Sequence, residues 1–330
     1  MYKKGFIAAF TSPVSSAFTE KHSMKKIMKK ETIFSTIIIG GSYAGLSAAM
    51  TLGRSLRQVL VIDSGLPCNR QTPHSHNFLT RDGAPPKEIL QVARQQVEQY
   101  AGISFHEGIA SKGNKIPGGF EISTSGGATF KAKTLVFATG IKDVMPGIKG
   151  FSECWGVSVI HCPYCHGYEV KGKKTAIMLS AERLMHFVPL IKNLTGQLTL
   201  LIKPHPSLGD DEIKKLKIHG ISILDEEVIE IEHSNGYVKN VVFKNGTKES
   251  FEAIYAPVPF EQHCHIPQAL GCELTEDGLL KVDPSHGTTI PGVYAVGDNA
   301  QPMRSVALAV AAGNIAGAII NNKLSHDDFQ

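Results

Sequence analysis

The sequence has few of the features that mark secreted, membrane or nucleic-acid-binding proteins. Six cysteines in 330 residues are too few for a disulfide scaffold, and no apolar stretch approaches the length of a membrane span. The body also lacks an excess of charge: residues 1–31 hold seven lysines and two glutamates, which leaves 27 basic against 28 acidic residues elsewhere. We therefore expect a protein of the reducing cytoplasm, with no nucleic acid partner, no membrane anchor and no disulfide framework.

The amino-terminal arm, residues 1–31, carries the local excess of positive charge. Lys3 and Lys4 followed by an apolar run to Phe10 have some likeness to a signal peptide, but the run is short and is broken at Pro13. We expect a disordered basic leader, either native or derived from a vector. The remaining chain is long enough for two domains, each with its own core.

Two cysteines separated by two residues, Cys162 and Cys165, stand near the middle of the chain. Such a pair can close a small disulfide ring, and one thiol titrates below an ordinary cysteine when it lies at a helix start or beside a cation. His161 and His166 flank the pair and can supply or take the proton that each exchange step moves. The segment predicts a redox dithiol that faces a flavin, so the rest of the chain must bind that flavin.

A dinucleotide-binding pattern follows the leader. The apolar run 36–39 predicts a buried strand that leads into the glycine turn 40–45 and then into a helix. A second strand at 59–62 ends at Asp63, which has the spacing of the acidic residue that binds a ribose hydroxyl. Ser42 replaces the middle glycine of the fingerprint, where a small hydroxyl side chain is tolerated. The alternative is a glycine turn in another kind of βαβ unit.

These motifs resemble those of the low-molecular-weight thioredoxin reductases and their thioredoxin-reductase-like relatives. Three further motifs support the resemblance: a strand that ends in the turn 138–140, the stretch 289–298, and Arg304 before a closing helix at 307–320. All of them stand in the family's order across residues 33–322. The resemblance implies an α/β protein that binds FAD, with two Rossmann-like three-layer ββα domains, the second inserted into the first.

The resemblance also implies a division of the chain and roles for the dithiol. Cys165 would lie against the flavin and exchange electrons with it, whereas Cys162 would attack or receive the sulfur of the partner. His166 stands where ordinary thioredoxin reductases have an acidic aspartate, as in relatives that oxidise dithiols of small molecules, and would shuttle the proton. The expected parts are the leader at 1–31, an FAD domain at 32–153 and 257–330, and an inserted NAD(P)-domain-like unit at 154–256.

By the same resemblance, FAD would be held by the glycine turn, the second strand and the carboxy-terminal motifs. Asp298 would bind the ribityl chain, and the first N–H groups of the closing helix would face the pyrimidine edge of the flavin. A loop with His74 and His76 would cover the isoalloxazine ring, which we favour over a metal site. The expected FAD-binding residues are Gly40, Ser42, Ala44, Gly45, Asp63, Asn69, Thr139, Gly140, Gly297, Asp298, Arg304, Ser305 and Val306.

The inserted unit lacks the glycine fingerprint with which related enzymes bind NADPH. The strand 174–178 runs into 179–184 without a glycine, and Glu182 brings a negative charge to the place of a pyrophosphate. After the next strand, 197–202, the segment 203–206 has two prolines and one lysine where the family has a basic cluster. The sequence therefore predicts that a regular NADPH site is absent. The alternative is a degenerate loop of small residues that still binds the nucleotide weakly.

The segment His263, Cys264 and His265 could, with the dithiol, suggest a zinc site. Zinc would occupy the thiols that must exchange electrons, so we expect His263 or His265 to lie near the dithiol as a second proton carrier. A surface turn without chemistry is the alternative. Cys264 has no partner at a suitable spacing and is expected to be a bystander, as are Cys154 and Cys272.

Three functions remain open. The first is an FAD-dependent thiol–disulfide oxidoreductase without a regular NADPH site, with O2 or a ferredoxin as the second electron partner. The second is an NAD(P)H-dependent thioredoxin reductase with a degenerate nucleotide loop, and the third is a flavin redox sensor. We favour the first with O2, acting on a small dithiol or disulfide or on a thioredoxin-like protein, and we expect a homodimer.

Overall fold

The computed structural model describes residues 32–179, 181–202 and 208–330. The predicted leader at 1–31 therefore lies outside the described residues. From Ile33 to Gln330 the chain forms one compact unit. None of the helices in the described ranges combines the length and the hydrophobicity that a bilayer-spanning segment needs.

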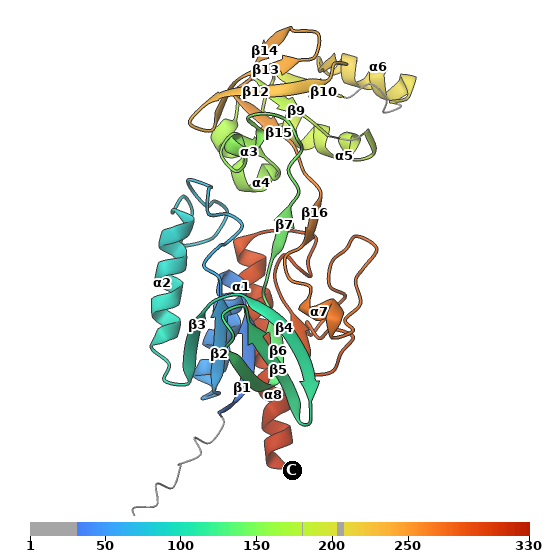
Figure 1. The fold of residues 1–330 in the computed structure, drawn as a ribbon. Helices are drawn as coiled ribbons and strands as arrows, with labels where there is room; N and C mark the ends of the chain where they lie inside the picture. Colours follow the sequence, from blue (N-terminus) through green and yellow to red (C-terminus); the bar gives the residue numbers. More distant parts are fainter. Residues whose placement is uncertain (1–31, 180, 203–207) are drawn as a thin grey trace, which may run out of the picture. The chain divides into compact units, whose positions relative to one another are not determined.

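A seven-stranded sheet forms the first part of the fold, with the order β3-β2-β1-β6-β5-β4 and β17 beside β6 (Figure 1). Its centre is parallel, and Ile37 and Ile38 of β1 are fully buried, as expected for a strand covered on both faces. The predicted strands at 36–39 and 59–62 are confirmed. The strands are β1 (Ile33–Ile39), β2 (Val59–Asp63), β3 (Ile103–Glu107), β4 (Ala110–Ile116), β5 (Gly119–Thr124), β6 (Thr129–Phe137) and β17 (Val293–Ala295).

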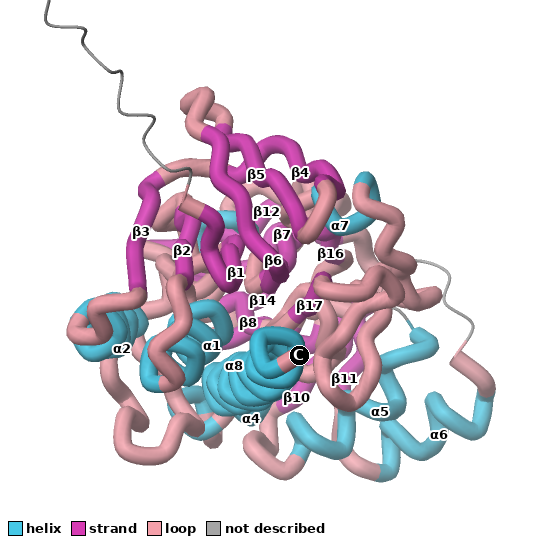
Figure 2. Tube along the Cα trace, turned by 90° about the horizontal axis from the view of Figure 1, so that it is seen from below, coloured by secondary structure: helices cyan, strands magenta, loops and turns pink. Residues whose placement is uncertain are grey.

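Helices α1 (Tyr43–Arg54) and α8 (Val306–Phe329) lie side by side, as Figure 2 shows, and share an apolar core with α2 (Pro86–Glu98). Their close approach depends on small residues. A Cβ atom on Gly313 would come within 2.1 Å of the backbone oxygen of Ala44. The glycine thus lets two helices that are distant in sequence pack backbone to backbone.

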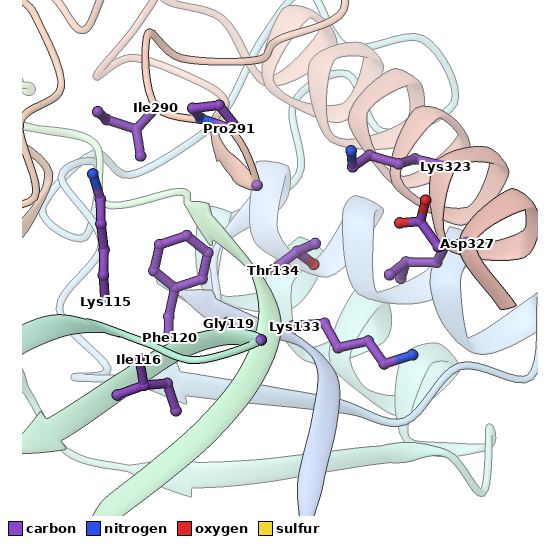
Figure 3. Close-up of a pocket in the computed structure, with 13 residues that line it drawn as sticks. Lys115, Ile116, Gly119, Phe120, Lys133, Thr134, Ile290, Pro291, Lys323 and Asp327 are labelled. Atoms are coloured by element: carbon purple, nitrogen blue, oxygen red, sulfur yellow. The ribbon is translucent and has the colours of Figure 1, made fainter.

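A cavity of about 470 Å³ opens between β5, β6, α8 and the loop before β17 (Figure 3). Its wall combines apolar side chains such as Phe120 with three lysines, Lys115, Lys133 and Lys323. No residue that the sequence predicts for FAD binding or for redox chemistry lines this cavity. We therefore place the candidate site elsewhere.

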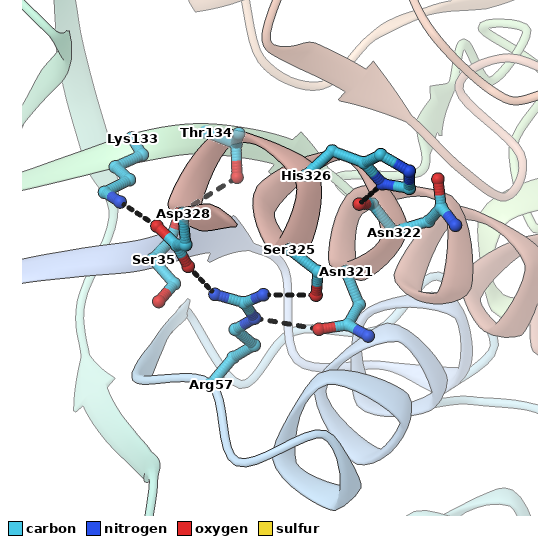
Figure 4. Close-up of polar contacts among 9 residues, drawn as sticks. All are labelled: Ser35, Arg57, Lys133, Thr134, Asn321, Asn322, Ser325, His326 and Asp328. Carbon is cyan, nitrogen blue, oxygen red and sulfur yellow. Dashed lines mark hydrogen bonds and ion pairs between the residues drawn. The ribbon is translucent and has the colours of Figure 1, made fainter. Parts of the chain in front are cut away.

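The closing helix extends beyond its predicted end. The apolar pattern predicts a helix at 307–320, but α8 continues because Arg57 holds its last turns (Figure 4). The Arg57 guanidinium donates hydrogen bonds to Asn321 Oδ1 at 2.8 Å and to Ser325 Oγ at 2.7 Å, and it forms an ion pair with Asp328. A pattern of apolar residues cannot predict these polar contacts. The predicted helix was therefore shorter than α8.

A second, five-stranded sheet has the order β11-β10-β9-β15-β8 and is parallel throughout. A three-stranded antiparallel sheet of β12, β13 and β14 lies between β11 and β15 along the chain. The five strands are β8 (Val159–Ile160), β9 (Thr175–Ile177), β10 (Leu198–Leu201), β11 (Ser222–Leu224) and β15 (Ala253–Tyr255). The other elements here are α3 (Phe151–Cys154), α4 (Pro163–His166), the 3-10 helix η1 (Tyr168–Val170), α5 (Ala181–Lys192), α6 (Asp210–Ile218), β12 (Val228–Ser234), β13 (Tyr237–Phe243) and β14 (Lys248–Ser250).

An antiparallel pair joins the stretches of chain that contain the two parallel sheets. Strand β7 (Ile141–Asp143) pairs with β16 (Phe260–Gln262), and the short helix α7 (Ile266–Ala269) follows. The two parallel sheets with their helices confirm the predicted α/β class. The domain limits at residues 153 and 256 stay a prediction.

Candidate functional site

The redox dithiol, Cys162 and Cys165, lies where β8 passes into α4. Cys162 is the N-cap of this one-turn helix, with extended backbone angles, and Pro163 occupies the first turn. The Cys162 side chain makes no capping hydrogen bond, but the backbone N–H groups of Tyr164 and Cys165 lie near enough to help lower the pKa of its thiol. Both cysteines are free thiols in the structure. The dithiol therefore lies at a helix start, which is one of the two settings that lower the pKa of a thiol.

The two thiols have opposite acidities. A hydrogen bond from the Cys165 thiol, helped by the backbone N–H groups and by the Arg304 charge, outweighs burial and lowers the pKa of Cys162 to about 7. The same hydrogen bond, together with burial and the negative charge on Cys162, raises the pKa of Cys165. At neutral pH the negative charge thus resides on Cys162, and Cys165 keeps its proton.

The flanking histidines are held neutral by their surroundings. Burial lowers the pKa of His161 to about 4, and the nearby Arg304 charge acts in the same direction. The His161 ring stacks on Trp155 with centroids 5.7 Å apart. Burial also lowers the pKa of His166, whose Nε2 is buried without a hydrogen-bond partner. Both imidazoles are consequently proton acceptors near neutral pH.

Arg304 connects the dithiol with the carboxy-terminal motif. Its guanidinium donates two hydrogen bonds to Asp143, at 2.8 and 3.2 Å, and its Nε lies 3.5 Å from Asp298 Oδ2. The Cys68 sulfur lies 4.0 Å from the same carboxylate oxygen. Close packing of protein atoms and the Asp298 charge raise the pKa of Cys68 to about 11, so this partly exposed thiol stays protonated. Sequence reasoning did not assign Asp143 or Cys68 to the site.

The glycine turn before α1 forms a tight cradle. A Cβ on Gly45 would lie 1.9 Å from the backbone oxygen of Gly40, and a Cβ on Gly40, whose φ is +106°, would lie 2.2 Å from that of Ala138. Ser42 is the N-cap of α1 with an ordinary φ of −93°, so no glycine is needed there. Its side chain makes no capping hydrogen bond, and the first turn contains no acidic residue. The backbone N–H groups of this turn can therefore receive a phosphate.

Other predicted residues meet at the same cradle. Asp63 accepts a hydrogen bond from the backbone N–H of Gly41 at 2.9 Å. The buried Asn299 donates to Phe137 O at 2.9 Å and to Thr139 Oγ1 at 3.2 Å. The turn 138–140 is thereby fixed beside the 297–298 motif. Asn299 was missed because its partners lie about 160 residues away in sequence.

Three further predicted residues lie at a helix start or contact one. Asn69 donates a hydrogen bond to the Tyr43 hydroxyl at the start of α1, at 3.2 Å, and its Oδ1 is buried without a partner. Ser305 is the N-cap of α8, where its hydroxyl oxygen accepts a hydrogen bond from the Leu308 N–H at 3.1 Å. Val306 is then the first residue of the helix, one residue before the predicted start at 307.

His263 and His265 lie beyond β16 with exposed side chains. The Lys142 ammonium lowers the pKa of the Glu261 carboxyl, and the two histidines act in the same direction. Among the described residues no hydrogen bond or ion pair joins either histidine to Cys162 or Cys165, and no cluster of three metal-ligating side chains occurs. The role of His263 or His265 as a second proton carrier stays a prediction.

Comparison with known proteins places the chain in a family. The family model of the pyridine nucleotide-disulphide oxidoreductases matches residues 34–316. The chain belongs to this family. It is 30% identical over 308 residues to thioredoxin reductase sirT of Leptosphaeria maculans, a match that covers 88% of this chain and 94% of the relative. A similar match, 30% over 314 residues, covers 91% of this chain and 97% of thioredoxin reductase tcpT of Claviceps purpurea.

A solved structure supports the same assignment. The crystal structure of an oxidoreductase from Agrobacterium tumefaciens is 34% identical to this chain and superimposes with a TM-score of 0.84. The match covers 89% of this chain and 99% of the other. This member of the pyridine nucleotide-disulphide oxidoreductase family is therefore an FAD oxidoreductase that acts on disulfides, as predicted.

The residues present fit FAD. The cradle at Gly40 and Gly45 leaves no room for side chains, and among the described residues the buried Asn69 Oδ1 and Arg304 Nε have no hydrogen-bond partner. Each of these atoms can pair with a polar ligand. The segments that would decide the NADPH question, residue 180 and residues 203–207, lie outside the described residues. The predicted absence of a regular NADPH site is therefore not tested.

Proposed function

We propose that the enzyme is an FAD-dependent dithiol oxidase, with O2 as the acceptor of the electrons. Bound FAD supplies a two-electron acceptor that O2 can reoxidise. The observation that supports the proposal is the unequal acidity of the dithiol: Cys162 has a pKa of about 7, whereas Cys165 keeps its proton. Cys162 thus has the character of an exchanging thiolate, and Cys165 that of its internal partner.

The exchange with substrate proceeds through the Cys162 sulfur. A thiolate of the substrate dithiol attacks Cys162 of the oxidised pair, a substrate–Cys162 bond forms, and the Cys162–Cys165 bond breaks. The second substrate sulfur then attacks the first, which releases an oxidised substrate and leaves Cys162 as thiolate. The substrate loses two electrons and two protons in total. The hydrogen bonds to Cys162 stabilise the leaving thiolate of the second step.

The neutral histidines move the protons of this exchange. His166 has a buried Nε2 without a hydrogen-bond partner, so it can take a proton without losing another bond. The proton that Cys165 gains when the disulfide opens must leave again when the disulfide closes. Burial keeps the pKa of His166 below its ordinary value. A protonated His166 imidazole therefore releases its proton readily.

An NAD(P)H-dependent thioredoxin reductase is the second candidate. The relatives sirT and tcpT, both 30% identical to this chain, bear the name thioredoxin reductase. In that case NADPH would donate the electrons, and a thioredoxin-like disulfide would receive them from Cys162. A ferredoxin as electron donor, the homodimer and the cytoplasmic location also stay predictions.

One anaerobic experiment separates these functions. The purified flavoprotein is mixed in a stopped-flow instrument with dithiothreitol, with NADPH and with NADH in parallel, and the flavin absorbance is followed before air is admitted. We expect rapid bleaching by the dithiol, slow or no bleaching by either nucleotide, and recovery of the yellow colour in air. Rapid bleaching by micromolar NADPH would identify the reductase instead. A flavin that stays oxidised under excess dithiol contradicts the oxidase.

A further inference from the structure

A cluster of three titratable side chains, those of His76, Asp82 and Glu169, lies beyond His166 and has no role in the exchange described above. His76 belongs to the loop between β2 and α2, and its Nδ1 lies 3.5 Å from Glu169 Oε1 of η1 and 3.7 Å from Asp82 Oδ1 of its own loop. The His76 ring faces that of His166 edge-on, with centroids 6.4 Å apart and an interplanar angle of 82°. These side chains therefore connect His166, the residue after Cys165, with the loop between β2 and α2.

The cluster also leads from the interior to the surface. The His166 Nε2 is buried, the His76 side chain is 20% exposed, and the Asp82 side chain is 70% exposed. A proton acceptor in each layer is what proton transfer to solvent requires, because each step then covers only a short distance. Asp82 is fixed in turn, since its Oδ1 accepts a hydrogen bond from the Asn77 N–H at 2.7 Å.

We propose that His76, held between Glu169 and Asp82, relays protons between His166 and solvent each time the dithiol changes its oxidation state. This inference rests on the proposed function. When the reduced pair closes, the Cys165 S–H bond breaks, the Cys162–Cys165 bond forms, two electrons leave for the bound FAD, and one proton is released. His166 takes this proton, and His76 carries a proton onward to Asp82 or water. His76 is thus a positioning residue that acts through His166.

The charges that face the two rings favour movement of the proton along the cluster. Burial lowers the pKa of His166, a positive charge on His76 lowers it further, and the Glu169 carboxylate opposes this effect. The two imidazoles therefore resist being charged at the same time, so that a proton on one ring promotes its release from the other. The carboxylates of Glu169 and Asp82 both lie on the His76 side of the cluster.

A purely structural role for His76 makes a different prediction, and His74 provides the matched control. His74 lies in the same loop with its ring centroid 6.3 Å from that of His76, but its Nδ1 contacts the backbone oxygen of Gly83 at 3.0 Å. It has no ion pair with Glu169. Replacing either histidine by glutamine changes the loop to the same extent, whereas only His76→Gln interrupts the relay.

The test is the rate of flavin bleaching by dithiothreitol in the anaerobic holoenzyme between pH 6 and 9. We expect His76→Gln to slow bleaching about tenfold or more and to flatten the pH profile, while His74→Gln keeps the wild-type rate. Added imidazole should restore the His76→Gln rate, since a small buffer can replace a missing proton carrier. Glu169→Gln should slow bleaching less than His76→Gln does. Adding Glu169→Gln to His76→Gln should cause no further loss of the bleaching rate. Equal rates and equal pH profiles for His76→Gln and His74→Gln overturn the relay.

A second measurement, alkylation of reduced Cys162 by iodoacetamide, does not depend on electron transfer. A relay leaves the acidity of Cys162 in place, so His76→Gln should keep the wild-type alkylation profile. A loss of alkylation parallel to the loss of bleaching would show a disturbed site and would overturn the relay. If dithiols fail to bleach the wild-type flavin, the proposed oxidase is wrong. The same three variants are then compared with NADPH and a disulfide substrate, where equal rates again reject the relay.

Discussion

The seven-stranded and the five-stranded sheet both contain neighbouring parallel strands but place their functional groups at different strand ends. In the seven-stranded sheet, β1 leads into a turn with glycines at residues 40, 41 and 45, and α1 begins without an acidic residue. In the five-stranded sheet, β9 leads into α5 through a sequence that has no glycine from 174 to 195. The dithiol instead follows β8. The comparison teaches that the loop after a strand, and not the sheet, decides which ligand the strand end can receive.

The largest effect is expected from an added methyl group in the glycine cradle. Gly45→Ala would place a Cβ 1.9 Å from the backbone oxygen of Gly40, which cannot move without displacing the turn. We expect a cost of about 3 kcal/mol or more, equivalent to roughly a 100-fold loss of FAD affinity. The measurement is the ratio of flavin to protein absorbance after dialysis.

The matched control for this variant lies beside the second sheet. A Cβ on Gly196, in the loop before β10, would meet no atom within 4 Å. Gly196→Ala should therefore keep the flavin content and the melting temperature of the wild type. Equal loss of FAD in both variants would show that the difference between the two loops is irrelevant to cofactor binding.

A smaller effect is expected from the buried histidine of the dithiol segment. The pKa of His161 is about 4 in the folded protein, below its ordinary value near 6.5. Between these values the unfolded chain binds more protons, so stability falls as pH decreases from about 6.5 toward 4. His161→Phe keeps a ring that can stack on Trp155. Between about pH 7.5 and pH 5, the free energy of unfolding should fall by about 2 kcal/mol less in this variant than in the wild type.

Urea unfolding followed by tryptophan fluorescence measures this difference, because Trp155 is the single tryptophan of the chain. The loss that remains in His161→Phe belongs to other groups, since burial also lowers the pKa of His166 and of His286. An identical pH dependence for the wild type and His161→Phe would contradict the buried, neutral state of His161.

The smallest of the three effects concerns the acidity of the dithiol. Cys165→Ala removes the hydrogen bond that contributes most to the low pKa of Cys162. We expect the pKa of Cys162 to rise by about one unit or more, with alkylation by iodoacetamide at pH 7 slowed roughly tenfold. Cys165→Ser keeps a hydrogen-bond donor and should lie between this variant and the wild type. Unchanged alkylation of Cys165→Ala would assign the low pKa to the helix start and to Arg304 alone.

The sequence was sufficient to predict elements whose residues are close together along the chain. The strand, the glycine turn and Asp63 lie within 36–63, and Cys162 stands three positions before Cys165, so local patterns predicted both places. The β3–β5 region was not predicted. In β5 half-buried side chains alternate with buried ones, and this alternation gives a weaker signal than the continuous apolar runs of the parallel strands.

The residues that were missed make contacts between distant segments. Asp143 holds Arg304 from 161 residues away, and Asn299 fixes the turn after β6 from a similar separation. The proposed relay likewise joins His76 to Glu169. No local pattern carries such a pairing, because the fold and not the spacing brings these side chains together. The role expected for His263 or His265 as a second proton carrier stays a prediction.

The antiparallel ladder of β7 and β16 has a consequence for how the chain can be rebuilt. Because Asp143 pairs with Phe260 and Ile141 with Gln262, the polypeptide leaves and re-enters the seven-stranded part at one point. The segment from residue 144 to residue 259 is thus a cassette with adjacent ends. A short hairpin turn could replace it, or a foreign module with similarly close termini could be grafted in its place.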